Sequence, residues 1–371
     1  MNSIIPDPVA RQPWGLLVPL VMLVVFGAAV LYSAGGGDMA SYAQPHLIRF
    51  SVFLGMALLL ARLPADFVRM AAFPAYGAVL ILLILVESIG AMGGGSQRWL
   101  DLGVIVLQPS EFMKPVIVLV LAQFYANLPP GMTHGWRALL PAGGLILLPV
   151  ALVLLQPDLG TAIAIIFGGV VMMFLAGLPM RWFAGAGAAG LVLLPLAYFF
   201  GLKDYQRQRV LTFLDPEADP LGTGYHIMQS QIAIGSGGLF GKGFGSGSQS
   251  HLNYLPEPHT DFVFATMAEE WGLAGGLFVL TMFALILRWG TMVARRAPDR
   301  FSRLLASGMV ATIFFYVAIN LMMVMGLAPV VGIPLPFMSH GGSSMLTNMI
   351  CIGTLMMVAR WTGRSGTRRI S

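Results

Sequence analysis

The most constraining feature of the sequence is a series of ten long apolar runs. Each approaches the roughly 20 mostly apolar residues that an α-helix needs to span a bilayer. The runs cover approximately residues 14–34, 46–62, 69–87, 109–126, 138–155, 160–178, 183–200, 262–288, 304–326 and 343–360. Charged residues form 10% of the chain, against about 25% in soluble globular domains, which excludes a soluble class. We therefore predict an all-α polytopic membrane protein with about ten transmembrane helices.

The positive charges indicate how these helices are oriented. If the N-terminus lies in the cytoplasm, 14 of the 21 Lys and Arg residues fall on the inner side, as the positive-inside rule requires. Of the 16 acidic residues, 13 fall on or near the outer face, and this bias predicts a functional site there. The first run is too long for a signal peptide, so we expect it to be retained, with both termini cytoplasmic. The net charge of +5 comes from loops between spans and does not indicate nucleic-acid binding.

A long polar segment, residues 201–261, connects the seventh and eighth runs on the predicted outer side. We treat 1–371 as a single transmembrane domain with this segment as a large outer loop. The glycine-rich part, 235–247, does not match a phosphate-binding P-loop, because Ser236 and Gly243 stand where that pattern needs Gly and Ser or Thr. It predicts a flexible or close-packed loop rather than a nucleotide site.

Asp261 lies where this wet segment meets the eighth apolar run. An ionisable side chain at such a boundary is a candidate functional group, because water reaches it from one side and hydrocarbon lies below. Small residues follow it at helical spacing, which close helix packing explains most simply. Further along the same helix, Glu269 and Glu270 must face the bundle interior or water rather than lipid.

Two more polar clusters lie on the predicted outer side, one at the start of the fourth run and one between the fifth and sixth runs. Glu111 and Lys114 are three residues apart, so they share a helix face and can pair. A structural ion pair and an anion-binding site are equally open for them. Asp158 follows Gln156 and Pro157 and can cap the next helix, and capping is the favoured explanation on the residues alone.

The remaining candidates are basic residues and the last loop. Arg98 precedes the fourth run, and Arg207 and Arg209 lie on the outer side against the general trend; arginine suits bidentate recognition of phosphate. The non-helical loop 328–344 should wall a cavity and contribute Ser339 and His340. No spacing of His, Cys and Asp resembles a dedicated metal site, and one cysteine allows no intramolecular disulfide. The residues alone fit an enzyme for a lipid-linked anionic substrate and also a transporter.

Six motifs in order resemble the SEDS family of shape, elongation, division and sporulation proteins, and the elongation type more than the division type. The motifs are QRWLDLG at 97–103, QPSEFMK at 108–114, QPDLGTA at 156–162, RVLTFLDPEADPLGTGYHIMQSQIAIGSGGLFGKG at 209–243, LPEPHTDFVFATMAEEWG at 255–272 and GIPLPFMSHGGSS at 332–344. The resemblance implies a peptidoglycan glycosyltransferase that polymerises lipid II at the outer face of the cytoplasmic (inner) membrane. It also implies a class B penicillin-binding protein, a transpeptidase, as partner.

The resemblance also assigns roles to residues. The essential aspartate of the family falls on Asp261, and the functionally important Glu, Lys and second Asp fall on Glu111, Lys114 and Asp158. Asp261 would then act as general base on the acceptor hydroxyl in an inverting reaction. The departing pyrophosphate would be neutralised by a divalent cation such as Mg or Mn, or by the available basic side chains, which are Lys114, Arg98, Arg207 and Arg209. The alternatives are a lipid II flippase, which is a transporter, and a non-catalytic scaffold for the transpeptidase.

Overall fold

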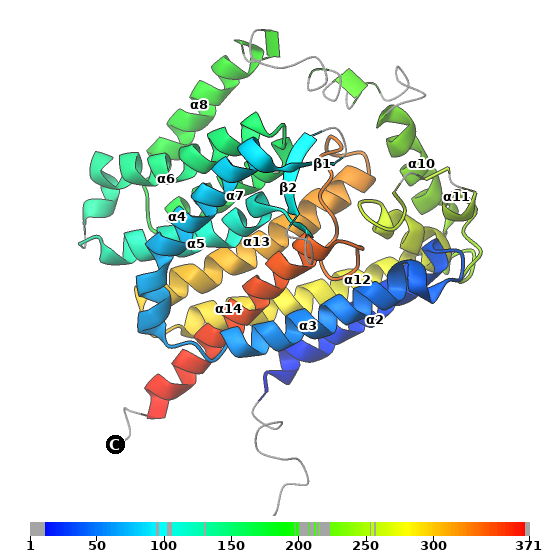
Figure 1. The fold of residues 1–371 in the computed structure, drawn as a ribbon, viewed down its shortest axis with the longest axis horizontal. Helices are drawn as coiled ribbons and strands as arrows, with labels where there is room; N and C mark the ends of the chain where they lie inside the picture. Colours follow the sequence, from blue (N-terminus) through cyan, green and yellow to red (C-terminus); the bar gives the residue numbers. More distant parts are fainter. Residues whose placement is uncertain are drawn as a thin grey trace, which may run out of the picture.

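The computed structural model describes residues 12–93, 96–101, 106–129, 131–196, 198–199, 207, 211–212, 215, 223–252, 254–255 and 257–367. Within them, one helix coincides with most of each of the ten predicted apolar runs (Figure 1). These helices are α2 (Trp14–Ala34), α3 (Gln44–Leu60), α4 (Ala65–Ile89), α5 (Pro109–Asn127), α6 (Trp136–Leu155), α7 (Leu159–Leu175), α8 (Met180–Leu196), α12 (Val263–Arg296), α13 (Arg300–Val324) and α14 (Gly342–Thr367). The predicted all-α membrane architecture is therefore confirmed, and the chain is a membrane protein.

In the described part of the chain, seven helical segments are at least 18 residues long and apolar enough to cross a bilayer by length and composition. They comprise α2, α4, α6, α12, α13, α14 and the segment Met39–Leu60, in which a π-helical turn, Met39–Ala43, leads into α3. The shorter apolar helices α7 and α8, together with α5, complete the set. Helix α5 carries Glu111 and Lys114 in its first two turns.

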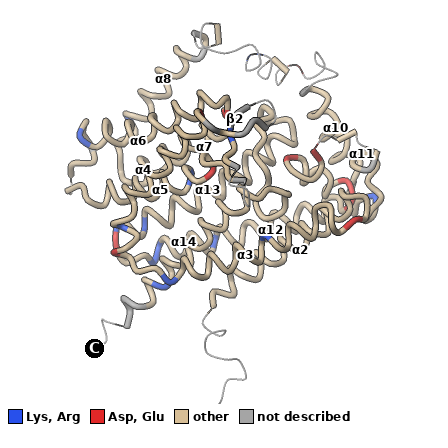
Figure 2. The backbone as a smooth tube through the Cα atoms, in the orientation of Figure 1, with Lys and Arg blue, Asp and Glu red and all other residues tan. Residues whose placement is uncertain are grey.

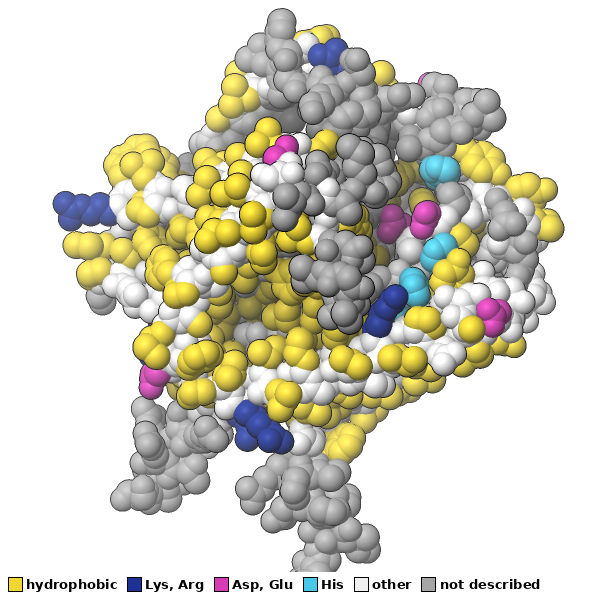
Figure 3. All heavy atoms as spheres, in the orientation of Figure 1, with side chains coloured by type: hydrophobic (Ala, Val, Ile, Leu, Met, Phe, Trp, Pro, Cys, Tyr) yellow, Lys and Arg dark blue, Asp and Glu magenta, His cyan; other side chains and the backbone are white. Residues whose placement is uncertain are grey.

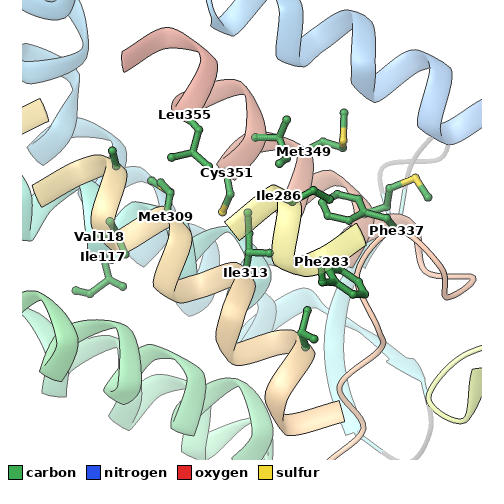
Figure 4. Packing of buried hydrophobic residues seen from close by; sticks show 14 of the residues in the cluster. Ile117, Val118, Phe283, Ile286, Met309, Ile313, Phe337, Met349, Cys351 and Leu355 are labelled. Carbon is green, nitrogen blue, oxygen red and sulfur yellow. The ribbon is translucent and has the colours of Figure 1, made fainter. Parts of the chain in front are cut away.

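Helix α13 lies at the centre of the bundle, in contact with α5, α7, α12 and α14. Apolar side chains from these helices form one continuous core around it (Figure 4). Cys351 of α14 is fully buried in this core, beside Ile313 of α13 and Leu355 in the view of Figure 4. Close contact is needed where Gly308 of α13 faces Val118 of α5, since a Cβ there would lie 2.4 Å from a valine methyl. Because this core is apolar and closely packed, we expect a functional site at the polar ends of the helices.

A small antiparallel sheet lies in the connection before α5. Its strands are β1 (Ala91–Gly93), β2 (Ser96–Asp101) and β3 (Val106–Leu107), in the order β1-β2-β3, with Leu100 of β2 opposite Leu107 of β3. From the sequence alone this connection is only a loop, because such short strands carry no clear alternating pattern. The sheet fixes Arg98 at the polar end of the bundle.

The glycine-rich part of the outer segment is clamped onto helix α12. Between α10 (Thr223–Ser236) and α11 (Ser248–His251), the chain exchanges four backbone hydrogen bonds with α12. Lys242 and Gly243 donate to the carbonyls of Glu269 and Glu270, and Leu273 and Ala274 donate to those of Gly238 and Leu239 (2.9–3.1 Å). Of the two alternatives for this segment, the structure shows the close-packed one.

The clamp is possible because α12 is broken at Gly272, which has φ +62° and ψ −155°. That conformation is accessible essentially to glycine alone. The side chain of Glu269 is fully buried beside the break and accepts hydrogen bonds from Lys242 Nζ (2.6 Å) and Ser248 Oγ (3.0 Å). Glu270 accepts one from the hydroxyl of Ser33 on α2. Both glutamates thus face the protein interior, one of the two places that the sequence analysis allowed for them.

Gly272→Ala should destabilise the protein by about 1–3 kcal/mol or more, because the backbone cannot keep this conformation with a side chain. A Cβ there would also lie 2.4 Å from the backbone nitrogen of Gly241. Thermal unfolding in detergent measures the effect. The matched control is Gly55→Ala on α3, where a Cβ meets nothing within 4 Å and the helix should gain slightly. Equal unfolding temperatures for the two variants would contradict the clamp.

Charged residues separate along the bundle. In Figure 2, basic residues gather at the end near the C-terminus, and acidic ones lie largely toward the other end, near α10 and α11. At the basic end, Arg69 pairs with Asp299 (2.9 Å) and Arg300 donates to the carbonyl of Ala176 (3.1 Å). The acidic end contains the connections that the sequence analysis placed outside.

Candidate active site

Asp261 is held in a turn between the outer segment and α12. Asn320 of α13 donates hydrogen bonds to the backbone carbonyls of Asp261 and Ile333, both at 2.8 Å. Ser339 Oγ donates to the carbonyl of Thr260 (2.6 Å), and the amide of His340 donates to that of His259 (2.8 Å). The turn and the 332–344 loop are therefore fixed to each other.

The carboxylate of Asp261 opens into a cavity of about 670 Å³ at the acidic end of the bundle. Its walls come from β2, the starts of α5 and α7, the turn before α12, and the loop leading into α14. Polar residues that line it are Arg98, Gln108, Glu111, Asp158, Thr161, Glu257, Thr260, Asp261, His340, Ser343 and Ser344. Figure 3 shows a hollow right of centre where acidic, histidine and basic side chains gather. Segments distant in sequence thus meet at one cavity.

The electrostatics of the cavity set Asp261 apart. Removal of its carboxylate from water, and then the nearby charge of Glu257, raise the pKa of Asp261 to about 6. No cation pairs with it within 4 Å among the described residues. A carboxylate with a raised pKa that faces a cavity is suited to accepting a proton.

Glu111 and Lys114 form a buried pair at the start of α5. Lys114 Nζ lies 2.5 Å from Glu111 Oε1 and donates to the hydroxyl of Tyr316 on α13 (2.7 Å). The same hydroxyl donates to Glu111 Oε2 (2.5 Å). Glu111 lines the cavity, whereas Lys114 is only 2% exposed and lies behind it. The ion pair that the sequence allowed is present, and a tyrosine joins it.

Asp158 combines two functions that the sequence analysis kept apart. Its Oδ1 accepts from the amide of Thr161 (3.1 Å), which caps α7, while Oδ2 accepts from Gln108 Nε2 (3.0 Å) at the cavity wall. Arg98 braces the same turn, because its Nε donates to the carbonyl of Gln156 (3.0 Å) and its Nη2 to that of Pro157. Capping therefore accounts for Oδ1 of Asp158, whereas Oδ2 lies at the cavity wall.

The structure does not bring all sequence-predicted residues to the wall. Ser339 is buried and holds the loop through hydrogen bonds to Thr260 and Leu335. Arg207 does not line the cavity, and its Nη2 donates to the carbonyl of Phe199 (2.9 Å). Arg209 lies outside the described residues. Their proposed substrate contacts, like those of the residues that line the cavity, stay predictions.

Several polar residues at the site escaped the sequence analysis. Tyr316 and Asn320 are one turn apart on α13, so one helix contacts the Glu111–Lys114 pair and the Asp261 turn. Arg49 of α3 bonds to His340, and Glu257 lines the cavity. A polar residue within an apolar run is the signal that could have found the first three. Among the described residues, no group of three or more His, Cys, Asp or Glu side chains is placed to hold a metal ion.

Comparison with known proteins identifies the family. The family model for cell cycle proteins of the FtsW, RodA and SpoVE type matches residues 11–363. The chain belongs to this family. This confirms the resemblance to the SEDS proteins, and every candidate site residue lies within the matched range.

Individual relatives cover nearly the whole chain. The protein is 42% identical over 354 residues to the peptidoglycan glycosyltransferase MrdB of Escherichia coli K12, covering 95% of this chain and 94% of that protein. It is also similar to one chain of a peptidoglycan synthase complex described as coordinating polymerization and crosslinking, with a TM-score of 0.81, 35% identity, and coverage of 95% and 98%. The crystal structure of the Thermus thermophilus rod shape determining protein RodA gives a TM-score of 0.68 at 33% identity, covering 96% and 98%.

Proposed function

We propose that this membrane protein is a peptidoglycan glycosyltransferase of the elongation type, which polymerises lipid II into glycan strands. The observation that carries the proposal is the carboxylate of Asp261, with its raised pKa, at a cavity shared by the family motifs. The name and the 42% identity of the Escherichia coli relative support the same activity. Purified protein given lipid II in detergent should produce glycan polymer.

The reaction joins a sugar hydroxyl to an anomeric carbon that carries an α-linked pyrophosphate. Because the product bond is β, the hydroxyl attacks from the face opposite the leaving group. Asp261 takes the hydroxyl proton, the new carbon–oxygen bond forms, and the carbon–oxygen bond to the lipid pyrophosphate breaks. Negative charge then grows on the departing pyrophosphate, which nearby donors and cations stabilise.

The rate should follow the ionisation of Asp261. A general base works only when deprotonated, so a pKa of about 6 predicts a rate that falls about tenfold per pH unit below that value and levels off above it. Glu257→Gln removes the nearby negative charge that raises this pKa, so its acid limb should shift to lower pH. Initial rates from about pH 5 to 8 test this. Identical acid limbs for wild type and Glu257→Gln would contradict the assignment.

A lipid II flippase is the competing function. A transporter needs a site near the membrane midplane that both faces reach in turn. The cavity described here is lined by helix ends and connecting loops at the acidic end of the bundle, which favours the enzyme. An assay in detergent distinguishes the two functions, because there is no membrane to cross and only an enzyme converts lipid II into polymer. Absence of polymer from folded, lipid II-binding protein would favour the transporter.

The basic end of the bundle is proposed to face the cytoplasm, with both termini, and the cavity to face the outer side of the inner membrane. The proposed partner is a class B penicillin-binding protein, and similarity to a chain of a peptidoglycan synthase complex supports it. The outer segment is the proposed contact through which the partner alters the cavity. Polymer yield measured with and without the transpeptidase tests this step. An equal yield in both conditions would contradict an effect of the partner on the cavity.

A further inference from the structure

The cavity requires a place for a pyrophosphate, yet most of its charged groups are acidic. Glu111, Asp158, Glu257 and Asp261 all line it. Two basic residues at this wall already make hydrogen bonds. Lys114 lies behind the wall, bonded to Glu111 and Tyr316, and Arg98 donates to two backbone carbonyls. Arg98 keeps its charge and its other N–H groups at one side of the cavity, and an anion needs further donors on another part of the wall.

The start of α14 offers such donors. Gly342, Ser343 and Ser344 line the cavity and form the first turn of this 26-residue helix. The first amides of a helix have no partner within it, and here none of the three donates to another described residue. These amides and the positive end of the helix dipole favour an anion.

The hydroxyl of Ser343 is an independent indication of a ligand. Ser343 is 8% exposed, lines the cavity and makes no hydrogen bond to another described residue. By contrast, Ser344 Oγ lies 3.5 Å from Asn348 Nδ2. The hydroxyl of Ser343 is therefore open to the cavity and can donate to a group that enters it.

Arg49 supplies a positive charge beside this corner: it is not itself one of the residues that line the cavity, but it lies next to Gly342, which is. Its guanidinium lies against Gly342, where a Cβ would be 3.8 Å from Nε. No described carboxylate lies within 4 Å of it. Its Nη1 donates to His340 Nε2 (3.0 Å), because arginine cannot accept. The proton of the neutral imidazole is then on Nδ1, which faces the carbonyl of Tyr42 (3.3 Å). His340 thus positions the guanidinium and leaves its charge unpaired.

We propose that Arg49, the hydroxyl of Ser343 and the amides at the start of α14 form a binding site for the pyrophosphate of a prenyl-linked substrate. The guanidinium fork matches two phosphate oxygens, and the hydroxyl and amides donate to others. His340 is a positioning residue for Arg49. The proposal rests on the proposed function for the nature of the lipid, whereas the donors are features of the cavity itself.

Binding of undecaprenyl pyrophosphate to the purified full chain in nanodiscs tests the site. Arg49→Met should weaken binding about tenfold or more, the loss expected for a charge-assisted contact. Arg295→Met, which removes an exposed charge at the far end of α12, is the matched control and should bind as wild type does. Wild-type affinity in Arg49→Met would overturn the proposal.

Ser343→Asp tests the charge of the ligand. The added negative charge should repel the pyrophosphate and weaken binding about tenfold or more, and the unfolding temperature of each variant is measured alongside its affinity. Ser343→Asn, similar in size and neutral, should bind far better than Ser343→Asp. Equal affinities for the two variants would overturn the site. His340→Leu removes the acceptor for Arg49 and should weaken binding of the pyrophosphate. His340→Gln should bind more tightly than His340→Leu, because the glutamine oxygen can accept from Arg49.

Two competitors show which part of the ligand is recognised. Inorganic pyrophosphate should compete with the prenyl compound in wild type and much less in Arg49→Met. Undecaprenol binding as tightly as its pyrophosphate would overturn the proposal. The result is independent of turnover: loss of binding in the variants supports the site even if the wild type makes no polymer. Polymerisation by variants that bind normally removes the site and leaves the proposed function.

Discussion

Asp261→Asn should lower glycan polymerisation by about 100-fold or more, because asparagine keeps the size of the side chain and cannot accept the hydroxyl proton. The measurement is the initial rate of polymer formation from lipid II by the purified variant. Asp215→Asn, an exposed carboxylate in the outer segment, is the matched control and should retain the wild-type rate. A well-folded Asp261→Asn preparation with near-normal polymer yield would exclude the general-base role.

The same substitution should leave the fold intact. Burial raises the pKa of Asp261 to about 6 from an ordinary value of 3.8, so the folded protein binds this proton more tightly than the unfolded chain. Stability from this group is therefore greatest at low pH and declines as pH rises from 3.8 through 6. Above that range the ionised group costs folding free energy, and neutral asparagine removes the cost. The unfolding temperature at pH 8 should equal or exceed that of wild type, which separates lost chemistry from lost structure.

The sequence could predict the helices because a span is recognised by length and composition, which are local properties. It could also single out Asp261, since the boundary between a polar segment and an apolar run lies within a few residues. The Glu111–Lys114 pair was also predictable from a local property, because a spacing of three residues places both side chains on one helix face.

The contacts that complete the site were out of reach because their partners are far apart in the chain. Tyr316 is 202 residues from Lys114, and Arg49 is 291 from His340. The break at Gly272 was missed for another reason. Small residues at helical spacing indicate close packing, but they do not reveal that one of them leaves the helical conformation to accept the glycine-rich segment.

Changing Glu111 or Lys114 alone should remove most activity and lower the unfolding temperature. Both side chains are nearly fully buried, and removal of one leaves an uncompensated charge, which costs about 3–5 kcal/mol in well-studied pairs. Tyr316→Phe should have a smaller effect, because the two charges still contact each other directly.

The decisive measurement is a double-mutant cycle with Glu111→Gln and Lys114→Met. The pair is in direct contact at 2.5 Å, so the double variant should lose less activity and less stability than the two single losses combined, with a coupling of about 1 kcal/mol or more. The unfolding temperature of the double variant should accordingly lie above that of the worse single variant. Strictly additive losses in both rate and unfolding free energy would show that Glu111 and Lys114 act independently. Lys114 would then have to act on the substrate without Glu111, from its buried position behind the cavity wall.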